Sequence, residues 1–427
     1  MSDAALPIAL QALGVAAKAS RRTDPALSLN RLKATFGRTT GEMPVVMAAP
    51  PTLSQTAPTE SGTGTSTALT SPYNERRAQT AGVVGTYYSI HDWANWRTRF
   101  TSSGVTFYGP SASGSEGVNQ AIVSFDFDGT SFDLCDRAGG RWTILADGEF
   151  VQSGFYTLTS AGGFAAVRLG VTFPSRVSKR IICYGQSFGF AGVATNRDSS
   201  IAAVALDQQI KVAALTNSYG QAIARNSVCG QFLECLFRMV DKEISPLFTL
   251  SAGGGSGFIT PGTGLKTFQD AGRLACITNA NPDIVIVADP YNDGTTGLTA
   301  GATAVFAALR AALPNAVIVS MSTFTPQTSS YSSGVAKHAL VYPALQSIAG
   351  PWIDIDMTAG VWVNSAGATG HAGQPPWCTG TGKDGSPTGD GNADFVTSAD
   401  GVHGSLYGSD YYARLTYTAL RAAIISL

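Results

Sequence analysis

The chain has 427 residues, 44% hydrophobic and 13% charged, with a net charge of −1, so it can bury the cores of two or three domains. This charge balance offers no basic field for a phosphate backbone, so nucleic acid is not expected as a partner. No apolar run reaches the roughly 20 residues that cross a bilayer, so no membrane span is expected.

The N-terminal region is expected to form a small helical or irregular segment over 1–48, followed by a linker over 49–81. The 48 glycines and the low charge are typical of β-rich, secreted or virion proteins, so an extracellular or virion-associated location is expected. Asp3 stands where a signal peptide carries basic residues, so no recognisable signal peptide is expected. The first segment is also where an oligomer contact is expected. The linker is predicted from residues 49–72, which are mostly Pro, Ser, Thr, Gly and Ala.

Residues 82–207 have a period near two. Short aromatic and β-branched stretches alternate with Gly, Ser and Asp-Gly turns, which predicts an antiparallel β-sandwich of the jelly-roll kind. Trp93, Trp96 and Trp142 are candidates for sugar contacts in this domain, with core packing as the favoured alternative for each.

Residues 208–427 alternate between apolar strands and amphipathic helices. Strands are expected at 211–217, 246–254, 283–291, 315–323 and 352–358, and helices at 229–244, 301–313 and 411–424. Such alternation predicts a parallel sheet with helices on both faces, a three-layer α/β/α fold. In these sheets the chemistry lies at the carboxyl ends of the strands.

A histidine and an aspartate lie just before the last expected helix. His403 is one of only four histidines, and Asp400 precedes it by three residues in a turn-prone Asp-Gly segment. At that spacing the carboxylate can accept Nδ1–H of the ring and leave Nε2 to take a proton from a hydroxyl. The alternative is that Asp400 caps the turn and His403 lies on the surface.

The expected partner hydroxyl is Ser218, which follows the first apolar strand and precedes Gly220. A serine on such a tight turn projects from the sheet, and its own N–H can point at a reacting oxygen. Ser187, after Gly185 and Gln186, is a second candidate. It follows what we take to be the last strand of the sandwich and no helix comes after it, so Ser218 is favoured.

Two further segments can donate hydrogen bonds to an oxyanion. The glycine-rich stretch 251–258 follows the second strand, where a bare N–H can approach a ligand closely. Asn292 follows the third strand and can direct its amide at developing negative charge. Ordinary loop and turn roles are the alternatives for both.

The segment 211–427 resembles the SGNH/GDSL hydrolases over its whole length. The resemblance rests on the order of the motifs: serine, glycine and Asn-Asp after three successive strands, then Asp-x-x-His before the final helix. The residues that match the family's site are Ser218, Gly255, Asn292, His403 and Asp400. This resemblance implies a flavodoxin-like sheet and a Ser-His-Asp esterase, with the N–H groups of Ser218 and Gly255 and the side chain of Asn292 as the oxyanion hole.

Two motifs depart from the family's pattern. Its usual Gly-Asp-Ser is Thr216-Asn217-Ser218 here, and its usual Gly-x-Asn-Asp is Pro290-Tyr291-Asn292-Asp293. Neither change removes a group that the chemistry needs.

A β-sandwich before such a domain resembles carbohydrate acetyl esterases and phage-tail deacetylases. This resemblance implies hydrolysis of O-acetyl esters on a polysaccharide or glycan, without metal or cofactor. Tyr219, Tyr291 and Trp377 are candidates for stacking on a sugar, with packing as the alternative. The six cysteines form no CxxC or Cys/His cluster, so no zinc site is expected. Buried free thiols are favoured, with a disulfide as the alternative.

Two other functions are compatible with the sequence. A lipase or thioesterase could use the same triad on long acyl chains. A glycan-binding or virion structural module could carry an inactive domain of this fold.

Overall fold

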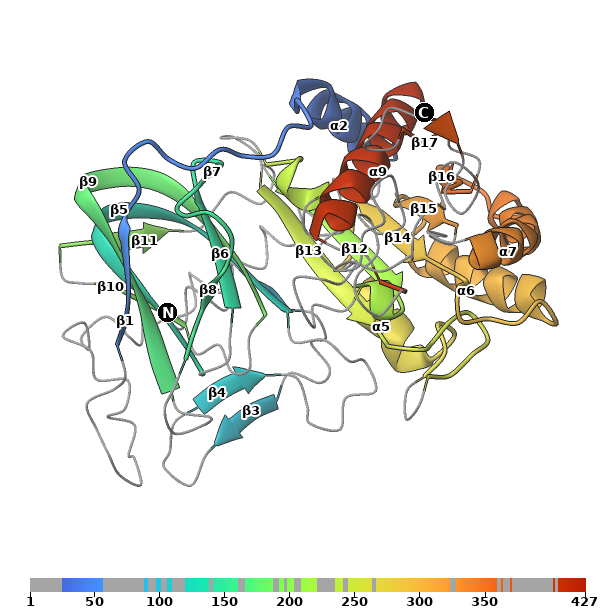
Figure 1. Cartoon of the computed structure of the whole chain (residues 1–427), viewed down its shortest axis with the longest axis horizontal. Helices are drawn as coiled ribbons and strands as arrows, with labels where there is room; N and C mark the ends of the chain where they lie inside the picture. The colour runs from blue at the N-terminus through green and yellow to red at the C-terminus, as the bar shows by residue number, and fades with distance from the viewer. Residues whose placement is uncertain are drawn as a thin grey trace, which may run out of the picture.

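The computed structural model describes two sheets and the helices that pack on them (Figure 1). The residues that it describes are 25–56, 88–90, 97–100, 106–109, 120–137, 141–159, 166–186, 192–195, 198–202, 209–220, 235–240, 245–262, 266–322, 328–358, 362–363, 369–370, 402–403 and 406–427.

A five-stranded parallel sheet organises the C-terminal half of the chain. Its strands are β12 (Gln209–Thr216), β13 (Ser245–Ala252), β14 (Ile284–Ala288), β15 (Val317–Met321) and β16 (Trp352–Ile355). Their order is β13-β12-β14-β15-β16, the flavodoxin-like order in which the second strand flanks the first. β14 and β15 are buried at every position, which explains their nearly continuous apolar sequences.

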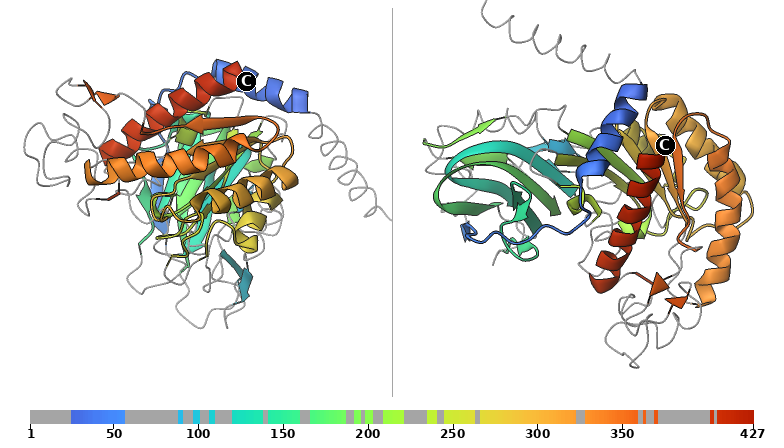
Figure 2. Two further views of the ribbon diagram at one scale, coloured as in Figure 1. Left: turned by 90° about the vertical axis from the view of Figure 1, so that its right-hand side faces the viewer. Right: turned by 90° about the horizontal axis from the view of Figure 1, so that it is seen from above.

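Helices cover both faces of this sheet, so the predicted three-layer α/β/α fold is confirmed (Figure 2). One face packs against α5 (Ala271–Asn279), α6 (Leu298–Ala312) and α7 (Thr328–Gln346), and the other against α2 (Pro25–Arg38) and α9 (Leu406–Ser426). Helix α6 shows why: its buried residues recur at spacings of three and four, which places them on one stripe.

Helix α2 belongs to the α/β/α layers although it precedes the antiparallel sheet in the chain. Its side chains Leu32 and Phe36 are each 1% exposed, and Phe36 stacks on Tyr417 of α9 with ring centroids 6.2 Å apart. Arg421 of α9 donates from Nε to the carbonyl of Phe36 over 2.8 Å. The N-terminal segment therefore contributes a helix to the C-terminal domain.

A nine-stranded antiparallel sheet forms the second part of the structure. Its strands are β1 (Thr52–Thr56), β2 (Tyr88–Ile90), β5 (Gln120–Arg137), β6 (Arg141–Ala146), β7 (Glu149–Phe150), β8 (Tyr156–Thr157), β9 (Ala166–Gln186), β10 (Gly192–Thr195) and β11 (Ser200–Ala202). Strand β1 lies inside the range expected to be a linker, and it pairs with β9. Because β10 and β11 follow β9, the expectation that β9 is the last strand is wrong; Ser187 lies outside the described residues.

The long strands β5 and β9 organise this sheet. They pair along most of their length, with a register shift between Gly129 and Ser131, and β9 pairs with β1 near its start and with β6 near its end. Their inward side chains, among them Phe125 and Phe132, form a core with Trp142, which is fully buried. The antiparallel arrangement is as predicted. The strands form one continuous sheet, and the jelly-roll arrangement stays a prediction.

An aromatic cluster joins the two sheets. Phe237 packs edge-on against Phe150 and Tyr184, with ring centroids 5.3 Å and 4.9 Å away. The Tyr184 hydroxyl also donates to the carbonyl of Pro246 in β13 over 3.4 Å. The antiparallel sheet is thus packed beside the β13 edge of the parallel sheet.

Short pairs of strands complete the description. These are β3 (Arg97–Phe100) with β4 (Thr106–Gly109), and β17 (Trp362–Val363) with β18 (Thr369–Gly370). The described free cysteines Cys183, Cys235 and Cys276 are buried. Within the described part of the chain, no helix has both the length and the apolar character needed to cross a membrane.

Candidate active site

The structure brings Ser218 and His403 together across the carboxyl edge of the parallel sheet. Ser218 follows β12 and opens a 3₁₀ turn, η4 (Ser218–Gly220), while His403 lies shortly before α9. The Nε2 atom of His403 is 2.9 Å from the Ser218 hydroxyl oxygen, although 185 positions separate the two residues. This is the distance at which an imidazole can take the proton of a hydroxyl.

The turn that carries Ser218 is held tightly. The side-chain oxygen of Asn217 accepts from the N–H of Tyr219 over 3.0 Å, and its main-chain oxygen accepts from Gly220 over 3.0 Å. A Cβ on Gly220 would lie 1.9 Å from a methyl carbon of Thr216, so only glycine fits there. These contacts stabilise the turn from which the Ser218 hydroxyl reaches His403.

Four predicted residues of the candidate sites lie outside the described residues. These are Asp400, the expected acid, and the expected sugar contacts Trp377, Trp93 and Trp96. Their roles stay predictions.

The expected oxyanion donors lie at the same edge as Ser218. The glycine turn after β13 is tied to β12 because Gly253 donates its N–H to Thr216 over 3.1 Å. Gly255 has a φ of 71°, a left-handed conformation that favours glycine. Asn292, after β14, donates from Nδ2 to the carbonyl of Ser256 over 2.9 Å. Ser218 and Asn292 thus follow the strands at the switch point of the sheet, where such folds bind ligands.

Asp293 anchors the glycine turn, a role that sequence reasoning did not assign. Its carboxylate accepts three main-chain N–H groups, those of Phe258, Ile259 and Thr260, at 2.8 to 3.0 Å. A Cβ on Gly257 would lie 2.3 Å from the same carboxylate, which requires glycine there. The only signal in the sequence was an Asn-Asp pair beside a glycine-rich loop.

Arg273 is a second residue that sequence reasoning missed. It lies on α5 and its side chain is fully buried. Its guanidinium donates to the carbonyls of Thr216 and Ser251 at 2.6 and 3.1 Å, and to the Ser256 hydroxyl at 2.8 Å. One rigid fork therefore joins the ends of β12 and β13 to the glycine turn.

Asp289 is buried beneath the Ser218 turn. Burial raises its pKa to about 7, although hydrogen bonds from the N–H of Tyr291 and the side chain of Asn217, and the charge of Lys337, act to lower it. The carboxyl oxygen Oδ1 accepts from Asn217 over 2.9 Å and from Tyr291 over 2.8 Å.

The two tyrosines proposed as sugar contacts differ in exposure. Tyr219 is 2% exposed; its ring packs against His403 at 5.2 Å, and its hydroxyl donates to Val402 over 3.3 Å. The Tyr219 ring is therefore covered in this structure. Tyr291 is partly exposed and packs edge-on against Tyr219, and Lys337 donates to its carbonyl over 2.6 Å. Of the two, only Tyr291 keeps a surface that a substrate could reach.

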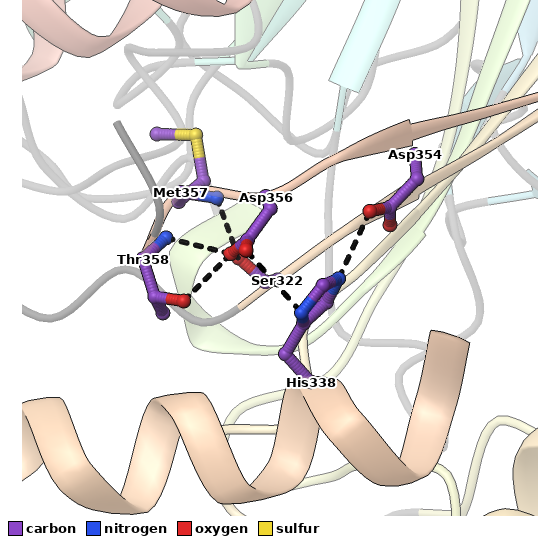
Figure 3. Close-up of polar contacts among 6 residues, drawn as sticks. All are labelled: Ser322, His338, Asp354, Asp356, Met357 and Thr358. Atoms are coloured by element: carbon purple, nitrogen blue, oxygen red, sulfur yellow. Dashed lines mark hydrogen bonds and ion pairs between the residues drawn. The ribbon is translucent and has the colours of Figure 1, made fainter. Parts of the chain in front are cut away.

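A second polar cluster lies at the β16 end of the same edge (Figure 3). His338 of α7 places Nε2 2.9 Å from Asp354 and Nδ1 3.4 Å from Asp356. Burial acts to lower the pKa of His338, but the hydrogen bond to Asp354 and the charges of both carboxylates outweigh it and raise that pKa. Asp356 also accepts from Ser322 over 3.1 Å and from Thr358, which helps hold its pKa below the usual range despite partial burial.

Among the described residues, no group of three or more His, Cys, Asp or Glu side chains could hold a metal ion. The ring nitrogens of His338 face two different carboxylates, so those three side chains do not converge on one point.

No protein-family model matches the chain, and no curated protein does. Solved structures are similar at low identity. The salicylyl-acyltransferase SsfX3 from a tetracycline biosynthetic pathway is 12% identical, with a TM-score of 0.46 over 72% of this chain and 83% of that chain. A family two carbohydrate esterase from Clostridium thermocellum, in complex with cellohexaose, is 11% identical, with a TM-score of 0.37 over 73% and 93%.

A GDSL-like lipase from Bacteroides ovatus is 10% identical, with a TM-score of 0.41 over 88% of this chain and 98% of that chain. At these identities a likeness concerns the fold, so the chemistry is argued from the residues of this chain. The present protein has the strand order, the serine after the first strand of the parallel sheet and the histidine before the last helix that the SGNH/GDSL resemblance implies.

Proposed function

We propose that the protein is a serine esterase in which Ser218 is the nucleophile, His403 the base and Asp400 the acid that orients the imidazole. The observation that carries the proposal is the 2.9 Å contact between His403 Nε2 and the Ser218 hydroxyl at the switch point of the sheet. A serine and a histidine at this distance form the nucleophile–base pair of acyl transfer.

The reaction follows in two steps. The oxygen of Ser218 attacks the ester carbonyl carbon while Nε2 of His403 takes the hydroxyl proton, and the carbonyl oxygen becomes an oxyanion. The N–H groups of Ser218 and Gly255 and the amide of Asn292 are the proposed donors to that oxyanion. The intermediate collapses, the ester oxygen leaves with the proton from His403, and an acyl-serine forms. Water then attacks the acyl-serine by the same route and releases the acid.

The proposed substrate is a short acyl ester, an O-acetyl group on a polysaccharide or glycan. A nearly neutral chain with 13% charged residues suits an uncharged polymer, and the partly exposed Tyr291 beside the dyad offers an aromatic edge for a sugar ring. Acetate release from a panel of acetylated polysaccharides identifies the polymer. A preference for C8 over C2 p-nitrophenyl esters would instead indicate a lipase or thioesterase.

The nucleophile is tested with p-nitrophenyl acetate. We expect Ser218→Ala to lower kcat by about 10⁴-fold or more, since it removes the hydroxyl that lies 2.9 Å from Nε2 of His403. The matched control is Ser322→Ala at the β15 end of the same edge, which should keep kcat within about threefold because Ser322 is 3% exposed and bound to Asp356. Wild-type turnover in Ser218→Ala would remove the proposed nucleophile. Glycan binding without turnover of any ester would favour a binding module.

A further inference from the structure

Asn217 is a buried carboxamide at the base of the Ser218 turn. Its side-chain oxygen accepts from the N–H of Tyr219 over 3.0 Å. An amide has one acceptor end and one donor end, so this bond fixes which way its NH₂ group faces. The NH₂ group must meet an acceptor, because a buried donor without one is strongly destabilising.

That acceptor is Asp289. Its carboxyl oxygen Oδ1 lies 2.9 Å from Nδ2 of Asn217, and its main-chain oxygen lies 3.3 Å from the same nitrogen. The same Oδ1 accepts the N–H of Tyr291 over 2.8 Å, and Tyr291 directly precedes Asn292. One oxygen atom therefore receives a donor from each of two turns, although Asp289 and Asn217 are 72 positions apart in sequence.

Hydrogen bonds also hold the turn that carries Asn292 to the glycine turn after β13, here called the glycine loop. Asn292 donates to Ser256, and Asp293 accepts three main-chain N–H groups of the loop. The nucleophile turn, the Asn292 turn and the glycine loop thus form one connected network. Hydrogen bonds to Asp289 link the first two, beside the edge-on contact of the Tyr219 and Tyr291 rings.

We infer that Asp289 is a positioning residue for the proposed esterase reaction: it holds the turn that carries Ser218 in register with the turn that carries Asn292. The inference rests on the proposed function and on these hydrogen bonds. What the network needs from position 289 is an acceptor oxygen, which a carboxylate, a neutral acid and an amide all supply.

Asp289→Ala tests the link, because it removes the shared side-chain acceptor. We expect kcat for p-nitrophenyl acetate to fall about 100-fold, with KM within about twofold, since misplacement of reacting groups slows the chemical step. Asn217→Ala should cause a loss of similar size while keeping the carboxyl. In the double variant the two losses should not add, because both changes break one connection. If Asp289→Ala does not fold, Asn217→Ala carries the test.

Asp289→Asn is the conservative variant, since its amide oxygen can accept both donors. We expect kcat within about threefold of wild type, a rescue that a purely charge-based role would not give. The matched control is Asp133→Asn in β5, also a buried carboxyl whose pKa burial raises, to about 6, but in the antiparallel sheet; it should leave kcat unchanged. An Asp289→Asn variant as slow as Asp289→Ala would overturn the inference.

Amide hydrogen exchange gives a readout that does not depend on activity. In Asp289→Ala the N–H groups of Tyr219 and Tyr291 should exchange at least about tenfold faster, while that of Val285 in β14 should not change. If the N–H groups of both tyrosines exchange at the wild-type rate in Asp289→Ala, or if this variant keeps the wild-type kcat, Asp289 is not a positioning residue. A wild-type protein that hydrolyses no ester would end the proposed function while the exchange experiment still decides what Asp289 holds.

Discussion

Two polar regions lie along the carboxyl edge of one sheet, and each contains a serine and a histidine. At the β12 end, the hydroxyl of Ser218 faces Nε2 of His403 over 2.9 Å. At the β15–β16 end, Ser322 is 3% exposed, and its hydroxyl donates to Asp356 over 3.1 Å and accepts from the N–H of Met357 over 2.6 Å. The same residue types at one edge are therefore arranged in two different ways.

The difference lies in the partners of the histidine. Both ring nitrogens of His338 face carboxylates, which favours the protonated ring and leaves no nitrogen to accept a proton from a hydroxyl. His403 presents Nε2 to a hydroxyl, which is the arrangement of a general base. A histidine between two carboxylates stabilises the fold as part of an ion pair. The presence of a serine and a histidine therefore does not by itself define a catalytic site.

The largest expected effect separates the two histidines by rate. His403→Ala should lower kcat for p-nitrophenyl acetate by about 10⁴-fold, because the proposed base is lost. His338→Ala should keep kcat within about threefold, because its ring touches no part of the Ser218 site among the contacts described. Steady-state kinetics on both variants checks this. If kcat falls equally in His403→Ala and His338→Ala, the two histidines do not differ in function as proposed.

A second prediction concerns the support beneath the Ser218 end. Arg273→Met should lower the free energy of unfolding by about 3 kcal/mol, because several buried carbonyl and hydroxyl acceptors lose their donor. Urea unfolding followed by circular dichroism measures the loss. The control is Arg176→Met, whose exposed ion pair with Asp128 should contribute less than about 1 kcal/mol. If Arg273→Met lowers the free energy of unfolding no more than Arg176→Met does, Arg273 does not have this supporting role.

The smallest expected effect is a pH dependence at the β16 end. The folded-state pKa of His338 is raised, so its stabilisation is fully present below about pH 6.5, the unfolded value, and is lost as the pH rises through the folded value. The stability difference between wild type and His338→Gln should therefore be larger at pH 6 than at pH 9.

Thermal unfolding across this pH range measures that difference. Asp354→Asn should reduce the same pH dependence, because it removes the hydrogen bond and charge that raise the pKa of His338. A pH-independent difference between wild type and His338→Gln would show that the ion pair contributes nothing.

Much of the α/β/α fold could be predicted from local pattern. Strands such as β14 and β15 are nearly continuous apolar runs, and such runs indicate buried parallel strands wherever they occur. The Ser218 and His403 positions followed from the same logic, since each stands at the end of a recognisable element. Helix α7 was not predicted, because its serines, Gly334 and Pro343 lower its helix propensity and tertiary packing of residues such as Leu345 compensates.

Strand β1 and the supporting network show where local pattern fails. The sequence of β1, TLSQT, is polar and sits in a stretch that is typical of a linker, yet pairing with β9 makes it a strand. Arg273 and Asp289 carry no motif, because their partners come from other strands and loops. Long-range pairing of this kind leaves no periodic signal along the chain.

The sequence by itself determined the alternation of strands and helices and the hydroxyl and imidazole that would meet, because apolar periodicity and turn residues act over a few positions. Only the tertiary structure decided that α2 packs on α9, that Tyr219 is covered, and that one carboxyl oxygen joins two turns. Those outcomes depend on which surfaces from distant parts of the chain pack against each other and exclude water. Such contacts form only when the chain has folded.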